Sequence, residues 1–291
     1  MSQPALPDPV ESFDRLLALL VELMEAQGGQ PRDDERAWLL DVQPLAKKFI
    51  YHLHSARQLC DGSTLLVNGA PHDFVSHGSV AVLVRAAIET FVTFGHVFAN
   101  SDERVSEFRH LVWRACGLND RQKFMAQNES NRVKLLKEGD EIAAWLKEAE
   151  AHPVFKALDK EQRRRILKSR EWRAGAGWPV LASGVGIHKL YFAQVYAYIC
   201  SYSHASYLAS MQMGQTDFEQ ELRFTGSLLQ MANIFMAHFA VLYASLFPRA
   251  QAALDQSSAR ELVMWWRITK ESHSNIYGPE DGPEENPDAG A

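Results

Sequence analysis

The segment Arg85-Ala-Ala-Ile-Glu89, together with His96, places three ionisable side chains in a stretch that is otherwise apolar. At about 100° per residue of an α-helix, all three lie within about 40° of one another on one face. Because nearly all other positions are apolar, we expect the whole helix to be buried. A buried charge without a partner costs several kcal/mol. Arg85 and Glu89 are therefore predicted to pair with each other and with a further group from another helix.

A second polar stretch, Tyr198-Ile-Cys-Ser-Tyr-Ser-His204, lies in a run that is typical of a buried helix over residues 187–212. On a regular helix Tyr198 and Tyr202 share one face, so they are expected to be core aromatic residues. Ser201 and His204 lie on another face, among small side chains that would let a second helix approach closely. The side chains of these two faces therefore cannot contact the same partner group.

We expect Arg85 or Glu89 to lie within hydrogen-bond reach of a side chain on the 187–212 helix. The resulting interior cluster of Arg85, Glu89 and His204 would either line a small ligand pocket or fix the packing of the helices. The candidate set is completed by His96, Ser201 and Tyr202. No reaction follows from these residues, and the ligand or protein partner is not defined by them.

A basic run between Lys160 and Arg173 is the strongest positive feature of the sequence. Followed by Trp172 and Trp178, it could contact the phosphates of a nucleic acid and stack a base, which predicts a binding scaffold. The alternative is a solvated helix face. The bases expected to contact phosphate are Arg163, Arg164, Arg165 and Lys168.

Motifs for metal ions and cofactors are absent from the sequence. His72, Asp73 and His77 could approach one ion if they share a loop. However, there is no His-Glu-x-x-His pattern, no pair of di-iron Glu-x-x-His motifs and no phosphate-binding loop. We predict neither a metal nor a cofactor.

Apolar periodicity and capping residues predict helices throughout the chain. Asp8-Pro9-Val10-Glu11 is a strong helix start, and Asp159 with Gln162 can cap another helix. Residues 61–78 contain turn formers and are expected to be a loop in which Leu65–Val67 could be extended. The helices expected after the first one cover about 33–60 with a kink or an interruption at Pro44, 79–99, 101–117 ending at Gly117, 120–152, 160–170, 187–212, 217–247 stopped by Pro248, and 259–269.

These elements predict an all-α fold, a multi-helix bundle with long buried helices. We expect a single helical domain over residues 1–277, with its core at about 33–247. Residues 278–291 are rich in acids and proline and lack basic residues, so a disordered acidic tail is predicted.

Composition argues for a soluble cytoplasmic protein. The net charge is -6 and the three cysteines are far apart, which favours free thiols in a reducing compartment. The apolar runs 80–98 and 228–247 approach membrane length, but each contains polar or charged residues that are costly in a bilayer. We read both runs as core helices and predict no membrane association. Nucleic acid could bind only locally, because the whole chain is acidic.

With these motifs, the chain resembles bacterial all-helical families described only as domains of unknown function. Those families combine an Arg-x-x-x-Glu helix, here Arg85 to Glu89, with a later Tyr-x-x-x-Tyr-x-His segment, here Tyr198 to His204. The resemblance covers about residues 40–245. It implies a helical bundle and carries no established activity.

The chain is also similar, more loosely, to the HEPN group of helical nucleases, which place Arg and His four to six residues apart on one helix. Arg104-Val-Ser-Glu-Phe-Arg-His110 has this spacing, although Val105 replaces the small polar residue usual in that group. The resemblance implies a ribonuclease in which Arg104 and His110 act on a phosphodiester. Both residues should then be exposed in a cleft, which a homodimer would place at its interface.

Overall fold

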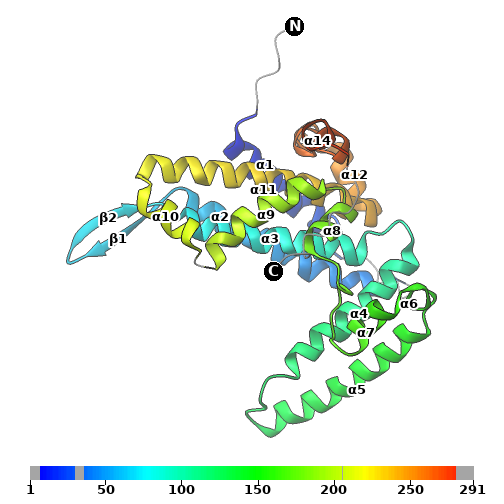
Figure 1. Ribbon diagram of the computed structural model, residues 1–291. Coiled ribbons are helices and arrows are strands. Elements are labelled where there is room, and N and C mark those ends of the chain that lie inside the picture. The colour runs from blue at the N-terminus through cyan, green and yellow to red at the C-terminus, as the bar shows by residue number, and fades with distance from the viewer. Residues whose placement is uncertain (1–6, 30–35, 205, 280–291) are drawn as a thin grey trace.

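The computed structural model describes residues 7–29, 36–204 and 206–279, and the regular secondary structure of this part of the chain is helical apart from one short hairpin (Figure 1). The predicted all-α class is therefore confirmed. In chain order the elements are α1 (Pro9–Glu25), the 3₁₀-helix η1 (Ala37–Asp41), α2 (Val42–Cys60), β1 (Ser63–Val67), β2 (Ala70–Phe74), α3 (His77–Phe98), α4 (Glu103–Arg121), α5 (Glu129–Ala151), α6 (Pro153–Ala157), α7 (Lys160–Leu167), α8 (Trp178–Gly184), α9 (Lys189–Ser203), α10 (Tyr207–Gln215), α11 (Phe218–Leu246), α12 (Pro248–Gln256), α13 (Arg260–Trp266) and α14 (Lys270–Tyr277).

The main core lies between α2, α3, α9 and α11, with α1 packed along α11. Its centre is aromatic: the ring of Phe239 lies 4.5 Å from that of Phe49 and 4.6 Å from that of Phe94. Phe13 of α1 and Val263 of α13 are also buried in this core. The core therefore extends beyond residues 33–247 at both ends, because α1 and α13 supply apolar faces that must be covered.

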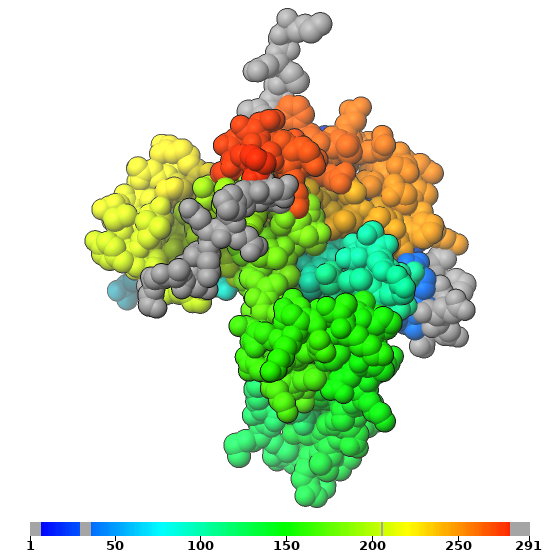
Figure 2. All heavy atoms as spheres, turned by 45° about the vertical axis from the view of Figure 1, so that its right-hand side comes forward, coloured from blue at the N-terminus to red at the C-terminus, as the bar shows by residue number. Residues whose placement is uncertain are grey.

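The helices α4 to α7 form an arm that projects from the main body (Figures 1 and 2). The arm has its own smaller core, in which Phe108, Ile142, Phe155 and Ile166 are buried. Trp172 packs against both cores and so connects the arm to the body. The single domain over residues 1–277 stays a prediction.

The two most apolar helices are α3 and α11, and both are long enough to cross a membrane by length and composition. Inside the protein, 67% and 72% of their most apolar windows are buried, as in the core helices of soluble proteins. This agrees with the interpretation of both runs as core helices.

Local capping sets the start of several helices as predicted. The Asp8 carboxylate accepts hydrogen bonds from the backbone N–H groups of Val10 and Glu11, and Pro9 occupies the first turn of α1. Asp159 and Gln162 form a complete capping box at the start of α7. These signals involve residues within one turn, so the sequence alone is sufficient to identify them.

The helix expected over residues 187–212 is two helices, which corrects the prediction. α9 ends at Ser203, with His204 as its C-terminal cap, and α10 begins after Ser206. The Ser206 hydroxyl accepts a hydrogen bond from the backbone N–H of Ala209 and so starts the new helix. A mid-run serine is both a weak helix former and a good cap, and here the cap prevails.

Three other boundaries agree only in part with expectation. Gly117 does not end a helix but lies within α4, where an added Cβ atom would meet no neighbouring group within 4 Å. Pro248 begins α12 as well as stopping α11, since proline suits a first turn. Pro44 lies in the first turn of α2, where its missing N–H has no helical partner to lose. The start expected at Asp33 and the acidic tail from residue 280 onward lie outside the described residues.

Residues 63–74 form an antiparallel hairpin rather than the expected loop. Asn68 and Gly69 both have positive φ, 52° and 82°, and connect the strands as a two-residue turn. Such a turn matches the twist of the strands and favours Asn-Gly in these positions. The Asn68-Gly69 pair was therefore the sequence signal that could have predicted the hairpin.

Candidate functional site

The Glu89 carboxylate forms the centre of a polar cluster between α3 and α9. Arg85 Nε donates a hydrogen bond to Glu89 Oε1 at 2.9 Å, and the Tyr196 hydroxyl donates to the same oxygen at 2.6 Å. The contact expected between Glu89 and the 187–212 segment is therefore present. Its α9 partner, Tyr196, was not among the predicted residues. A tyrosine in a buried helix needs a partner for its hydroxyl, and this need was the available signal.

The surroundings keep Tyr196 a donor and Arg85 a cation. Burial raises the pKa of Tyr196, and its hydrogen bond to the Glu89 carboxylate raises it further. Burial lowers the pKa of Arg85, but the neighbouring Tyr196 and Glu89 outweigh burial and raise it. The Arg85 guanidinium also lies 5.6 Å from the centre of the Tyr196 ring. Oxygen Oε1 of Glu89 is consequently held by two fixed donors.

A hollow of about 280 Å³ lies beside this cluster, and Glu89 forms part of its wall. The second carboxylate oxygen, Oε2, accepts no hydrogen bond from the described residues. The remaining wall consists of Leu45, Lys48, Ala86, Thr90, Thr93, Trp113, Trp172 and Trp178.

The three tryptophans of this wall come from different elements: Trp113 from α4, Trp172 from the loop after α7, and Trp178 from the first turn of α8. The rings of Trp172 and Trp178 are 6.3 Å apart and inclined at 73°, so they form a corner. Trp113 lies far from the other two tryptophans in the sequence. It could not be assigned to this wall from the sequence, because its position depends on how the arm joins the body. The hollow thus combines an aromatic corner with the Glu89 carboxylate, one oxygen of which accepts no hydrogen bond from the described residues.

His204 does not join the cluster, which corrects the prediction. The residue is exposed at the end of α9, because the helix breaks there instead of continuing. Ser201 donates its hydroxyl to the carbonyl of Tyr198 within its own helix. Tyr202 donates to Gln212 of α10 at 2.6 Å and so connects the two halves of the segment.

His96 follows Glu89 along α3 but makes no contact with the carboxylate. Its ring lies 5.8 Å from the ring of Trp172, and the Arg109 guanidinium donates to its backbone carbonyl at 2.9 Å. Burial, with a smaller contribution from the Arg109 charge, lowers the pKa of His96 to about 3. His96 is therefore a neutral packing partner of Trp172.

Arg104 and His110 are not arranged as the nuclease hypothesis requires. The Arg104 side chain is exposed and pairs with Asp102 at 2.9 Å. His110 is buried, only 2% exposed, and its Nε2 lies 2.8 Å from Asp41. The hypothesis needs both residues exposed in one cleft, so the structure gives it no support.

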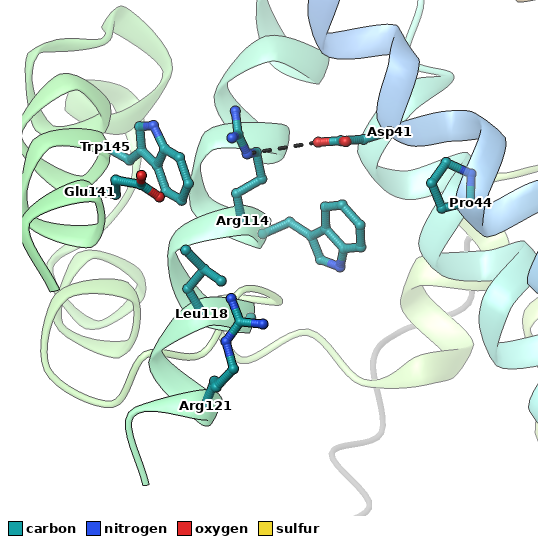
Figure 3. A pocket seen from close by; sticks show the side chains of 9 residues that line it. Asp41, Pro44, Arg114, Leu118, Arg121, Glu141 and Trp145 are labelled. Carbon is teal, nitrogen blue, oxygen red and sulfur yellow. Dashed lines mark ion pairs between the residues drawn. The ribbon is translucent and has the colours of Figure 1, made fainter. Parts of the chain in front are cut away.

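The Asp41 carboxylate next to His110 borders a second, larger recess between η1 and the arm (Figure 3). The hydrogen bond from His110 lowers the pKa of Asp41, and the Arg114 charge adds to this effect. Arg114 lies 3.7 Å from Asp41 and stacks on Trp145 of α5, with its guanidinium 4.0 Å from the ring centre. Hollows of about 450 Å³ and 590 Å³ flank this bridge. Arg114 therefore connects the arm to the body.

The basic segment around α7 uses most of its charges internally. Arg164 and Arg165 both pair with Glu161, and Arg165 also pairs with Glu171. The hydrogen bond from Arg164 is the main reason why the pKa of Glu161 falls to about 2. Arg163 donates to the backbone carbonyl of Leu158, while Lys168 is exposed. This arrangement is typical of a solvated helix face and gives no support to a phosphate-binding surface.

The fold and the Glu89 cluster define an all-helical protein organised around a polar group that α3 and α9 share. The chain belongs to a family of unknown function (DUF5677), whose model matches residues 49–222. The match contains Glu89, Tyr196 and the three tryptophans of the hollow, but not Asp41. The resemblance to helical domains of unknown function is thus confirmed. No curated protein and no solved structure matches the chain.

Proposed function

We propose that the protein is a cytoplasmic bacterial binding protein for a small organic ammonium compound, held between the Glu89 carboxylate and the tryptophans of the adjoining hollow. One observation carries this proposal. Arg85 and Tyr196 occupy Oε1 of Glu89, while Oε2 accepts no hydrogen bond from the described residues and Glu89 borders an aromatic hollow. A carboxylate oxygen held in place without a donor is ready to accept an N–H group.

The aromatic wall favours a cation over a flat ring. The negative face of an indole attracts a cation within about 6 Å of the ring centre, and cages of such rings bind ammonium groups. Trp172 and Trp178 meet at 73°, which encloses a compact group from two sides. A planar base could stack face to face on only one of these two rings, because they are not parallel. Trp178 already holds one cation, because the Arg173 guanidinium lies 5.1 Å from its ring centre.

The size of the hollow limits the ligand. Its volume of about 280 Å³ lies just below the usual range for pockets of drug-sized molecules, about 300–1,000 Å³. A short alkylammonium or a quaternary ammonium headgroup fits this limit. Arg85 and Tyr196 fix the carboxylate before the ligand arrives, so less ordering is needed on binding.

The three cysteines favour a cytoplasmic location. Cys60 and Cys116 are buried free thiols, and Cys200 is partly exposed and also free. Burial raises the pKa of Cys60 to about 11 and that of Cys116 to about 12, so both are protonated and unreactive. Free thiols are usual where the surroundings are reducing.

The direct test is a titration of the purified protein with tetramethylammonium and n-butylammonium, followed by calorimetry and tryptophan fluorescence. Butyrate, which has the same alkyl chain as butylammonium but a negative charge, is the ligand control. We expect saturable binding of the ammonium compounds and none of butyrate. If neither ammonium compound showed saturable binding, the proposal would be overturned.

Variants of Glu89 and Lys48 test the charge requirement. Glu89→Gln keeps the shape but removes the charge, and we expect butylammonium to bind about tenfold more weakly or worse, since hydrogen bonds to charged groups contribute about 1.5–3 kcal/mol. Lys48→Gln removes a positive charge from the wall of the hollow. This charge repels the ammonium group, so butylammonium should bind more tightly to the variant. Glu129→Gln, at an exposed acid of α5, is the matched control and should change nothing. Equal affinity of the wild type and Glu89→Gln would contradict the assignment.

A further inference from the structure

The β1–β2 hairpin projects from the body beside α10, and all ten of its strand residues are exposed (Figure 1). Leu65 and Leu66 are 57% and 70% exposed, and Val67 and Phe74 are exposed as well. An isolated two-stranded hairpin is marginally stable in water, and its free edges can pair with another strand. A further strand that pairs with one of these edges would therefore stabilise the hairpin.

The two edges of the hairpin differ in their ability to pair. The strand β2 contains Pro71, which lacks an N–H, and the charged Asp73, and both features discourage further pairing at its edge. The strand β1, Ser-Thr-Leu-Leu-Val, has neither a proline nor a charged residue. The open edge is therefore that of β1.

The turn determines which backbone groups of β1 face outward. The two-residue turn closes on the pair Val67 and Ala70, so that pair exchanges hydrogen bonds within the hairpin. Hydrogen-bonded and non-hydrogen-bonded pairs alternate along antiparallel strands. Leu66, opposite Pro71, and Thr64, opposite Asp73, are consequently in non-hydrogen-bonded pairs. Their N–H and C=O groups point away from β2, toward the open edge.

We propose that this edge pairs with β1 of a second copy of the chain, antiparallel and around a two-fold axis at Leu65. In this register Thr64 of each copy faces Leu66 of the other, and each such pair exchanges both N–H···O bonds. The outward-facing groups of the two strands therefore match without a shift. Leu65 lies opposite Leu65 of the second copy, which buries two exposed side chains against each other.

The second copy is the partner that this edge fits best. A two-fold contact needs a surface that is complementary to itself, and the outward groups at Thr64 and Leu66 meet this condition. Because β1 has no charged side chain, two identical strands do not repel each other. The result is a four-stranded sheet that spans two copies.

Sedimentation measurements over a range of protein concentrations test the proposal. We expect the mass to rise with concentration from 32.8 kDa toward twice that value. Leu65→Lys and Leu65→Glu each place like charges opposite each other at the axis, so each variant alone should remain monomeric. An equimolar mixture of the two variants should recover the dimer, because opposite charges then face each other. Recovery in the mixture also shows that the hairpin of both variants is folded.

Val133→Lys, at a residue of α5 that is 56% exposed, is the matched control and should dimerise like the wild type. A wild-type protein that stays monomeric at every concentration would overturn the proposal. A dimer that persists in Leu65→Lys would also overturn it, since the contact would then lie elsewhere. If the mixture stayed monomeric while the wild type dimerised, the two-fold register at Leu65 would be wrong. None of these outcomes depends on ammonium binding at Glu89.

Discussion

His238, in the middle of α11, should make the protein sensitive to acid. Its side chain is almost fully buried, and its Nε2 donates a hydrogen bond to the carbonyl of Ile268 at 3.0 Å. Burial lowers its pKa from 6.5 to about 4, and the nearby Arg267 and His273 also disfavour a charge there. The folded protein therefore holds His238 neutral at a pH where the unfolded chain is already protonated.

The size of the effect follows from the two pKa values. Above pH 6.5 both states are neutral at this site, so the site adds no pH dependence. As the pH falls below 6.5 only the unfolded state takes up the proton, and the free energy of unfolding decreases until the folded pKa near 4 is reached. At about 1.36 kcal/mol per pKa unit, the total loss is about 3 kcal/mol, of which about 2 kcal/mol has occurred by pH 5.0.

Urea unfolding at pH 7.5 and pH 5.0, with wild type and His238→Gln, measures this loss. Glutamine cannot titrate, and its amide can still donate to Ile268. The decrease in the free energy of unfolding between the two pH values should be smaller in His238→Gln by about 2 kcal/mol. His54→Gln, at an exposed histidine of α2, should behave like the wild type. The same pH dependence in the wild type and in His238→Gln would refute the reasoning.

Two further predictions concern packing, and both are checked by urea unfolding. Arg121→Ala leaves the buried Glu138 carboxylate without its ion pair and should lower the free energy of unfolding by about 2–3 kcal/mol. The double variant Arg121→Ala with Glu138→Gln should recover part of this loss. If it recovered nothing, the buried charge would not be the cause. Gly95→Ala would place a Cβ atom 2.5 Å from Val185 Cγ1, where α3 and the end of α8 meet, and should cost about 1–3 kcal/mol. Gly139→Ala in α5 meets no atom within 4 Å and should stabilise slightly; equal effects of the two alanines would contradict the packing explanation.

The sequence could predict features that depend on neighbouring residues. The apolar periodicity identified α1, α3 and α11, and the acids Asp8 and Asp159 marked helix starts, because a cap and its targets lie within one turn. The pairing of Arg85 with Glu89 followed from their spacing on one helix. The Asn68-Gly69 turn belongs to the same local class, although the expectation of a loop overlooked it.

Other features depended on contacts between distant parts of the chain. Tyr196 reaches Glu89 across 107 residues, and this contact exists only because α9 packs on α3. The break after Ser203 removed His204 from the interior, since a local serine cap prevailed over the apolar run.

The hollow beside Glu89 shows the same division. From the sequence, Glu89 could be recognised as a buried acid that needs partners, because its helix is apolar on most sides. That Trp113, Trp172 and Trp178 surround it depends on the path of the arm, which leaves the body after α3 and returns at α8. Helix formation is governed by hydrogen bonds and side chains within a few residues, whereas the meeting of three elements is decided by the burial of apolar surface over the whole chain.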